Sequence, residues 1–253
     1  ASKYVQDISD RFGLGEKSFV VELASNDGYL LQYFVERGVP VLGVEPAQNV
    51  AEEARKKGVQ TESVFFGVNT AKRLARENIK NFIDHGVQKI LVSSPHCYHT
   101  FKNEYPEFMV NFEVVHISQY LLTLIDEGRL ELTKAYDKKI TYHDPCYLGR
   151  HNGIYDEPRE ALKRVPGLAL SEMPESRENS LCCGGGGGRI WMDTPQEERF
   201  SDIRLRQAEA TGAQVLATSC PYCITNFEES RLNLEYEDVL EVKDITEIIA
   251  ESL

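Results

Sequence analysis

The chain contains an internal repeat, and this repeat limits its fold more than any other feature of the sequence. Residues 86–97 (GVQKILVSSPHC) align without a gap on residues 212–223 (GAQVLATSCPYC), at an offset of 126. Residues 113–118 then match residues 241–246 at an offset of 128. Each copy has the pattern of a buried strand followed by a helix, so we expect two similar halves.

Strand and helix patterns alternate along the whole chain. We predict strands at 18–24, 40–45, 89–93, 113–117, 139–143 and 214–218, and helices at about 69–85, 118–127, 158–164, 196–211 and 244–252. This alternation predicts an α/β fold of two Rossmann-like halves. We expect a Cys-Pro-Tyr-Cys turn after the strand at 214–218, and no regular element in the glycine run 184–188.

The chain is acidic, with 28 Lys and Arg against 40 Asp and Glu and a net charge of −12. This charge argues against nucleic acids and anionic membranes as partners. No apolar run approaches the roughly 18 residues of a membrane span, and no secretory signal opens the sequence. We therefore expect a cytoplasmic protein, either free or peripheral to a membrane-associated complex.

Clustered cysteines are the strongest chemical signal. In a cytoplasmic chain they indicate metal or redox chemistry rather than structural disulfides. Thiolates are soft ligands that suit iron–sulfur clusters and zinc, and five exceed the four that tetrahedral zinc takes. A cluster is therefore favoured, with a structural zinc site or a redox dithiol as alternatives. The five are Cys146, Cys182, Cys183, Cys220 and Cys223.

The first copy of the repeat has lost most of this set. Cys97 aligns with Cys223, but Ser94 stands where the second copy has Cys220. We therefore expect the working site in the second copy. Beside it, His143 and Asp144 precede Cys146, and two interpretations are open: both residues hydrogen-bond to thiolate sulfur, or Asp144 caps or braces its loop.

Three stretches carry a resemblance to a known family: 141–150 (TYHDPCYLGR), 181–184 (LCCG) and 219–223 (SCPYC). They resemble the cysteine-rich CCG domain of heterodisulfide reductase subunits and related iron–sulfur oxidoreductases, over about residues 70–253. The resemblance implies a non-cubane 4Fe–4S cluster that passes electrons or cleaves disulfides. It maps the cluster ligands onto Cys146, Cys182, Cys183, Cys220 and Cys223.

The same resemblance implies partners. Relatives work as subunits of complexes, so we expect an electron-donor iron–sulfur or flavoprotein subunit and a thiol/disulfide or quinone-linked partner. The ferredoxin-like segment of many family members does not occur in this sequence, so we expect the donor to be another chain. The degenerate first copy argues against disulfide cleavage by two clusters.

Residues 19–31 (FVVELASNDGYLL) and 43–46 (GVEP) are similar to the S-adenosylmethionine half of sugar C-methyltransferases. A strand, a glycine-containing turn and a helix N-terminus can cradle a polar cofactor. The resemblance assigns Glu22, Asn26, Gly28 and Glu45 to that cofactor site. It ends near residue 75, before a substrate domain, so we favour a scaffolding role over cofactor binding or methyl transfer.

These patterns predict three segments. Residues 1–75 form a methyltransferase-like βα segment that stands in for part of the first repeat. Residues 76–130 are the remainder of that degenerate repeat, and 131–253 are the cysteine-rich repeat. The change of resemblance near residue 75 suggests a recombined, engineered or mis-assembled sequence.

Overall fold

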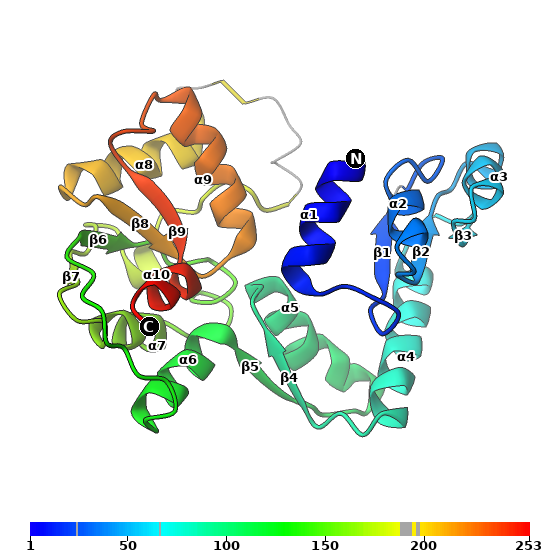
Figure 1. Ribbon diagram of the computed structural model, residues 1–253, viewed down its shortest axis with the longest axis horizontal. Coiled ribbons are helices and arrows are strands. Elements are labelled where there is room, and N and C mark those ends of the chain that lie inside the picture. The colour runs from blue at the N-terminus through cyan, green and yellow to red at the C-terminus, as the bar shows by residue number, and fades with distance from the viewer. Residues whose placement is uncertain (24, 66, 188–193, 196–197) are drawn as a thin grey trace. The chain divides into compact units, whose positions relative to one another are not determined.

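The computed structural model describes residues 1–253 except 24, 66, 188–193 and 196–197, and it forms two compact units, residues 1–85 and 86–253 (Figure 1). The start of the predicted helix 196–211 and the last glycine of the run 184–188 lie outside the described residues. Both units combine helices with parallel sheets, so the predicted α/β class is confirmed.

The first unit is built on a three-stranded parallel sheet in the order β1-β2-β3. Val5 of the first helix, Leu31 and Phe34 of the second and Val41 of β2 form its core. The first helix was not predicted; it ends where Gly13 adopts φ +61°. The elements are α1 (Ser2–Phe12), β1 (Val20–Leu23), α2 (Leu31–Glu36), β2 (Val41–Val44), α3 (Gln48–Lys56), β3 (Thr61–Glu62) and α4 (Val68–Asp84).

The second unit begins with a two-stranded parallel sheet and continues into a four-stranded one, in the order β7-β6-β8-β9. The first part holds β4 (Lys89–Val92), α5 (Pro95–His99), the short helices η1 (Thr100–Glu104) and η2 (Tyr105–Phe108), β5 (Glu113–His116) and α6 (Ile117–Asp126). The second holds β6 (Lys139–Tyr142), α7 (Asp156–Lys163), β7 (Ala169–Leu170), η3 (Arg177–Asn179), α8 (Phe200–Ala210), β8 (Val215–Thr218), α9 (Pro221–Asn233), β9 (Glu241–Asp244) and α10 (Ile245–Glu251).

The internal repeat corresponds to a βαβα unit that occurs twice. Lys89 of β4 pairs with Glu113 of β5, and the aligned residues Val215 and Glu241 pair in the same way. The helix after each pair starts with a capping box, at His116 in α6 and at Asp244 in α10. The two copies belong to different sheets, however, so the structure shows a shared unit rather than two complete Rossmann-like halves.

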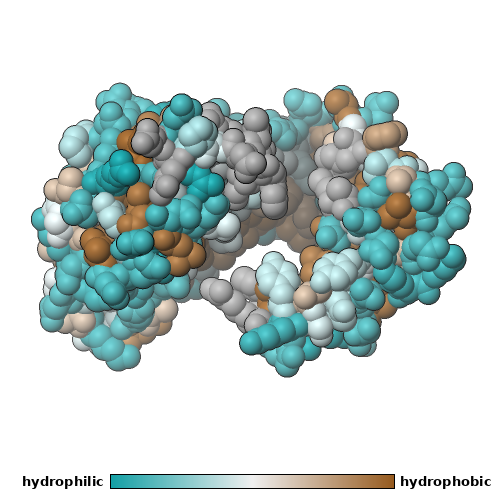
Figure 2. All heavy atoms as spheres, turned by 90° about the horizontal axis from the view of Figure 1, so that it is seen from above, coloured by the Kyte–Doolittle hydropathy of each residue, from teal (hydrophilic) through white to brown (hydrophobic). Residues whose placement is uncertain are grey.

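Helices cover both faces of the four-stranded sheet, because side chains alternate along β8. Val215 and Ala217 pack with residues of α7 and α10, whereas Leu216 packs with Leu205 of α8 and Phe227 of α9. Figure 2 shows hydrophilic residues over much of the visible surface of the chain. Among the described residues, no helix is both long enough and apolar enough to span a bilayer.

The Cys-Pro-Tyr-Cys segment differs from the prediction, because it starts a helix instead of forming a turn. Cys220 is the N-cap residue of α9 and Pro221 is its first residue. Proline suits this position, since its φ is already helical and its missing N–H would have no partner there. Cys223 therefore lies in the first turn of a thirteen-residue helix.

Candidate metal centre

Two adjacent parallel strands bring cysteines to one edge of the four-stranded sheet. β6 leads into the loop of Cys146, and β8 leads directly to Cys220. These strands pair with each other, with Tyr142 opposite Ala217, so their carboxyl ends lie together. Cys182 and Cys183 come from the loop that follows η3.

The five cysteine sulfurs form a contiguous set. Sγ of Cys223 donates to Sγ of Cys183 across 3.3 Å. Cys182 also interacts with Cys146 and Cys183, and Cys220 interacts with Cys223. All except Cys182 line one small pocket. The structure thus brings all five predicted ligands together.

The thiols ionise unevenly because they are crowded. Hydrogen bonding from Cys146 lowers the pKa of Cys182 to about 2, and hydrogen bonding from Cys223 lowers the pKa of Cys220 to about 5. The contact with Cys182 raises the pKa of Cys146, and raises the pKa of Cys183 to about 12. Neighbouring thiolates repel one another, so these thiols cannot all ionise unaided. A cationic metal core would offset that repulsion, because metal binding deprotonates its thiol ligands.

The glycine loop supplies a backbone donor to this set. The N–H of Gly184 points at Sγ of Cys182, 3.3 Å away. Gly184 has φ +83°, a left-handed conformation that glycine adopts without strain. The amide of Asn226 in α9 donates to the carbonyl oxygen of Cys183 and so ties the loop to the helix. A backbone donor such as the Gly184 N–H stabilises thiolate sulfur.

His143 lies at the end of β6 and is completely buried. Its Nδ1 accepts a hydrogen bond from Nε of Arg204, over 3.2 Å. Among the described residues its Nε2 has no hydrogen-bond partner. One ring nitrogen of His143 lies within 4.8 Å of the sulfurs of Cys183 and Cys223. Burial lowers the pKa of His143 well below its usual value, so the ring is neutral.

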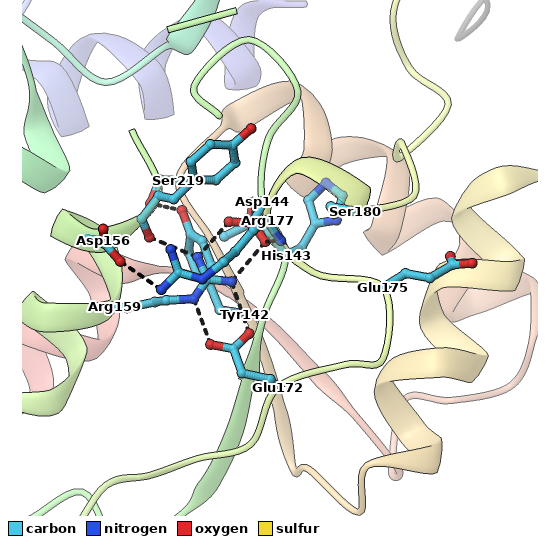
Figure 3. A network of polar contacts seen from close by, with 12 residues as sticks. Tyr142, His143, Asp144, Asp156, Arg159, Glu172, Glu175, Arg177, Ser180 and Ser219 are labelled. Atoms are coloured by element: carbon cyan, nitrogen blue, oxygen red, sulfur yellow. Dashed lines mark hydrogen bonds and ion pairs between the residues drawn. The ribbon is translucent and has the colours of Figure 1, made fainter. Parts of the chain in front are cut away.

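Asp144 braces the loop between β6 and the first cysteine, which is the second of its two predicted roles. Arg159, only 1% exposed, donates to both carboxylate oxygens of Asp144 over 2.6 and 2.9 Å and to both of Glu172 over the same two distances (Figure 3). The backbone N–H of Arg177 donates to Asp144 over 2.7 Å. The carboxylate is therefore fully engaged by the loop and by α7.

The degenerate copy of the repeat also contributes to the pocket. His96 lines it and stacks on Tyr147, with ring centroids 4.1 Å apart. Tyr222 meets the same ring edge-on at 5.1 Å. Cys97, the neighbour of His96 on α5, is exposed and does not line this pocket. No sequence pattern indicated that a histidine ring from this copy lies beside the cysteines.

Three functional side chains were missed at the sequence level: Arg159, Arg204 and Asn226. The two arginines are 1% and 0% exposed, although arginine in a helix is usually a surface residue. Their positions in α7 and α8 fall within predicted helices, but no pattern there marks a buried cation. Asn226 lies three residues after Cys223, and that spacing within a helix was the one available signal.

The predicted S-adenosylmethionine residues lie in the first unit, and some of them are close together. Glu45 accepts hydrogen bonds from the backbone N–H of Asn26 over 3.1 Å and of Ala47 over 2.9 Å, one on each carboxylate oxygen. Gly28 has φ +74°, and a Cβ there would lie 2.9 Å from Val59. Burial raises the pKa of Glu22 in β1. The carboxylate of Glu45 therefore holds the backbone of residues 26 and 47 in place. The assignment of these residues to an S-adenosylmethionine site stays a prediction.

A family model described as a cysteine-rich domain (CCG) matches residues 59–102 and 140–228, which together are more than half of the chain. The chain belongs to the CCG cysteine-rich domain family. The family resemblance predicted from three short motifs is thus confirmed, and the match includes the first strand and helix of both copies of the repeat and all five clustered cysteines.

Several curated relatives of this CCG chain are named as oxidoreductases. The "Probable iron-sulfur-binding oxidoreductase FadF" of Bacillus subtilis is 42% identical over 72% of this chain and 26% of its own length. The "EtfAB:quinone oxidoreductase" of Syntrophomonas wolfei is 35% identical over 91% of this chain and 35% of its own. A subunit of the dihydromethanophenazine:CoB–CoM heterodisulfide reductase of Methanosarcina barkeri is 36% identical over 73% of this chain and 46% of its own.

These comparisons do not support a recombined sequence. The alignment with the Syntrophomonas protein covers 91% of the chain, so it crosses the suggested junction near residue 75. The family match also starts at residue 59, inside the segment that resembles methyltransferases. The chain spans about a quarter to a half of the length of these relatives.

Proposed function

We propose that residues 131–253 hold one iron–sulfur cluster through Cys146, Cys182, Cys183, Cys220 and Cys223, and that the chain relays electrons within an oxidoreductase complex. The observation that carries this proposal is the convergence of five sulfurs at one sheet edge, where the sulfurs of Cys183 and Cys223, 40 residues apart in the chain, lie 3.3 Å from each other. The family and the names of the relatives support it.

The residues present fit a cluster better than a single metal ion. Five sulfurs exceed the four positions of tetrahedral zinc. The Gly184 N–H and the buried His143 ring both face sulfur, as the polar groups around iron–sulfur centres do. When bound, the cluster would supply one-electron chemistry, and a non-cubane 4Fe–4S form would account for all five sulfurs.

Electron relay is favoured over disulfide cleavage for this chain alone. Reduction of a disulfide to two thiols takes up two electrons and two protons. The first copy of the repeat, with Ser94 in place of a ligand and Cys97 exposed, offers no second cysteine set among the described residues. We propose an iron–sulfur or flavoprotein subunit as donor, and a quinone-linked or thiol/disulfide partner as acceptor, as the relatives' names suggest.

The test is the content of iron, acid-labile sulfide and zinc in protein purified without oxygen. We expect iron and sulfide near four each per chain, as the proposed cluster requires, and negligible zinc. About one zinc without sulfide would overturn the proposal and make the second unit a structural module. Loaded protein should then exchange electrons with a low-potential dye in a stopped-flow experiment, and Cys183→Ser protein should not.

A further inference from the structure

Arg204 determines which nitrogen of His143 carries the proton. A guanidinium group donates hydrogen bonds and cannot accept them, so Nδ1 of His143 must be the acceptor in their 3.2 Å contact. The proton of the neutral ring is therefore on Nε2. This conclusion depends on the geometry of the contact and on the chemistry of arginine.

The guanidinium is held in place by further hydrogen bonds. It donates to the carbonyl oxygen of Glu175 over 2.8 Å, to Gln207 over 2.7 Å and to the hydroxyl of Ser180 over 3.1 Å. Arg204 has no exposed surface, so it cannot turn away into solvent. The ring of His143 is fixed on its other side by an edge contact with Phe227.

Nε2–H is a buried donor without an acceptor among the residues that the structure describes. Such groups are rare because an unsatisfied buried donor is unfavourable. Within 4.8 Å of the ring lie the sulfurs of Cys183 and Cys223, and the negative charge of Cys182 also acts on it. Sulfur is therefore the acceptor that this donor faces, and it becomes anionic when the thiols deprotonate to bind a cluster.

The same geometry argues against His143 as a metal ligand. A histidine that binds a metal through one nitrogen carries its proton on the other and normally donates it to an acceptor. Here the other nitrogen, Nδ1, faces the donor groups of Arg204. Binding of iron through Nε2 would set a ring N–H against a guanidinium N–H.

We propose that His143 donates a hydrogen bond from Nε2 to sulfur of the bound cluster or its thiolates, with Arg204 as the positioning residue that fixes the tautomer. The inference rests on the proposed function, since it needs an anionic cluster. Added electrons increase the negative charge on the sulfurs, so this donor stabilises the reduced state and raises the midpoint potential.

A measurement on unmutated protein tests the hydrogen bond directly. Protein labelled with ¹⁵N-histidine is loaded, brought to its paramagnetic state and examined by pulsed EPR in H₂O and in D₂O. We expect a weak ¹⁵N coupling together with an exchangeable proton that deuterium replaces. Strong ¹⁵N coupling from direct ligation, or no histidine coupling, would overturn the proposal. Absence of iron and sulfide would instead refute the proposed function.

Redox titration of variants tests the effect on the potential. His143→Phe should make reduction at least tenfold less favourable, a fall of about 59 mV for one electron. His143→Gln keeps an N–H donor and should recover part of that fall, and Arg204→Met should lower the potential in the same direction. His116→Asn, which changes another fully buried histidine of the same unit, is the matched control. An unchanged potential in His143→Phe protein with full iron and sulfide would contradict the proposal.

Discussion

The sulfurs of Cys183 and Cys223 lie 3.3 Å apart, one in the glycine loop and the other in the first turn of α9. Serine at either position replaces a soft thiolate with a hydroxyl that binds iron poorly. We expect Cys183→Ser and Cys223→Ser to lose most of the iron and sulfide and to change the visible absorption spectrum.

Cys97 provides the matched control, because it is the aligned counterpart of Cys223 but is exposed on α5. Cys97→Ser should keep the iron, the sulfide and the spectrum of the unmutated protein. A Cys183→Ser protein with an unaltered spectrum would remove Cys183 from the ligand set.

Asp144→Asn should destabilise the second unit, because it leaves the buried guanidinium of Arg159 with half of its carboxylate partners. Removal of one partner from a buried ion pair costs about 3 to 5 kcal/mol, and the remaining pair with Glu172 favours the lower value. Urea denaturation measures the change. Asp156→Asn, which alters an ion pair whose aspartate is 72% exposed, should cost less than about 1 kcal/mol. Equal losses in the two variants would contradict this expectation.

The stability of the second unit should depend on pH through His116. Burial lowers the pKa of this ring from 6.5 to about 4 in the folded chain. The unfolded chain therefore binds more protons between these values. The free energy of unfolding is therefore not reduced by His116 above pH 6.5, and it falls by about 3 kcal/mol as the pH drops from 6.5 through 4.

His116→Asn should remove this part of the pH dependence, since asparagine does not titrate and is a good N-cap residue for α6. Denaturant unfolding at pH 7.5, 6, 5 and 4 measures the difference between the two proteins. Parallel curves for the two over this range would show that His116 is not the titrating group.

Glu45→Ala should destabilise the first unit, because two backbone N–H groups lose their acceptor. We expect a loss of about 1 to 3 kcal/mol, seen as faster hydrogen exchange in residues 20–62. Glu52→Ala, on the exposed side of α3, is the control and should have little effect. Calorimetric titration with S-adenosylmethionine separates this bracing role from cofactor binding, which requires a saturable signal.

The position of the cysteine site was predictable because it follows from topology. Cys146 and Cys220 each come shortly after an apolar strand, and parallel strands place their ends at one edge. The β4–β5 and β8–β9 pairs were predictable from the repeat, whose offsets match the observed pairing. These features depend on local pattern and chain order, which the sequence displays directly.

The remaining features depend on long-range contacts that no local pattern displays. Arg204 meets His143 across 61 residues and Arg159 meets Asp144 across 15, so their burial follows from tertiary packing. The Cys-Pro-Tyr-Cys segment was predicted as a turn, although proline is common at the first position of a helix, and the helix that it starts was missed. The distribution of strands over three sheets likewise depends on packing.

The copy of the repeat that has lost its ligand set keeps its architecture. β4 and β5 pair in the same register as β8 and β9, although Ser94 replaces a thiol there and Cys97 points to solvent. This framework therefore forms from its apolar contacts and helix caps, without inorganic material to organise it. The β8–β9 pair has the same register, so we expect the apoprotein to form this strand pair before any iron and sulfide are bound.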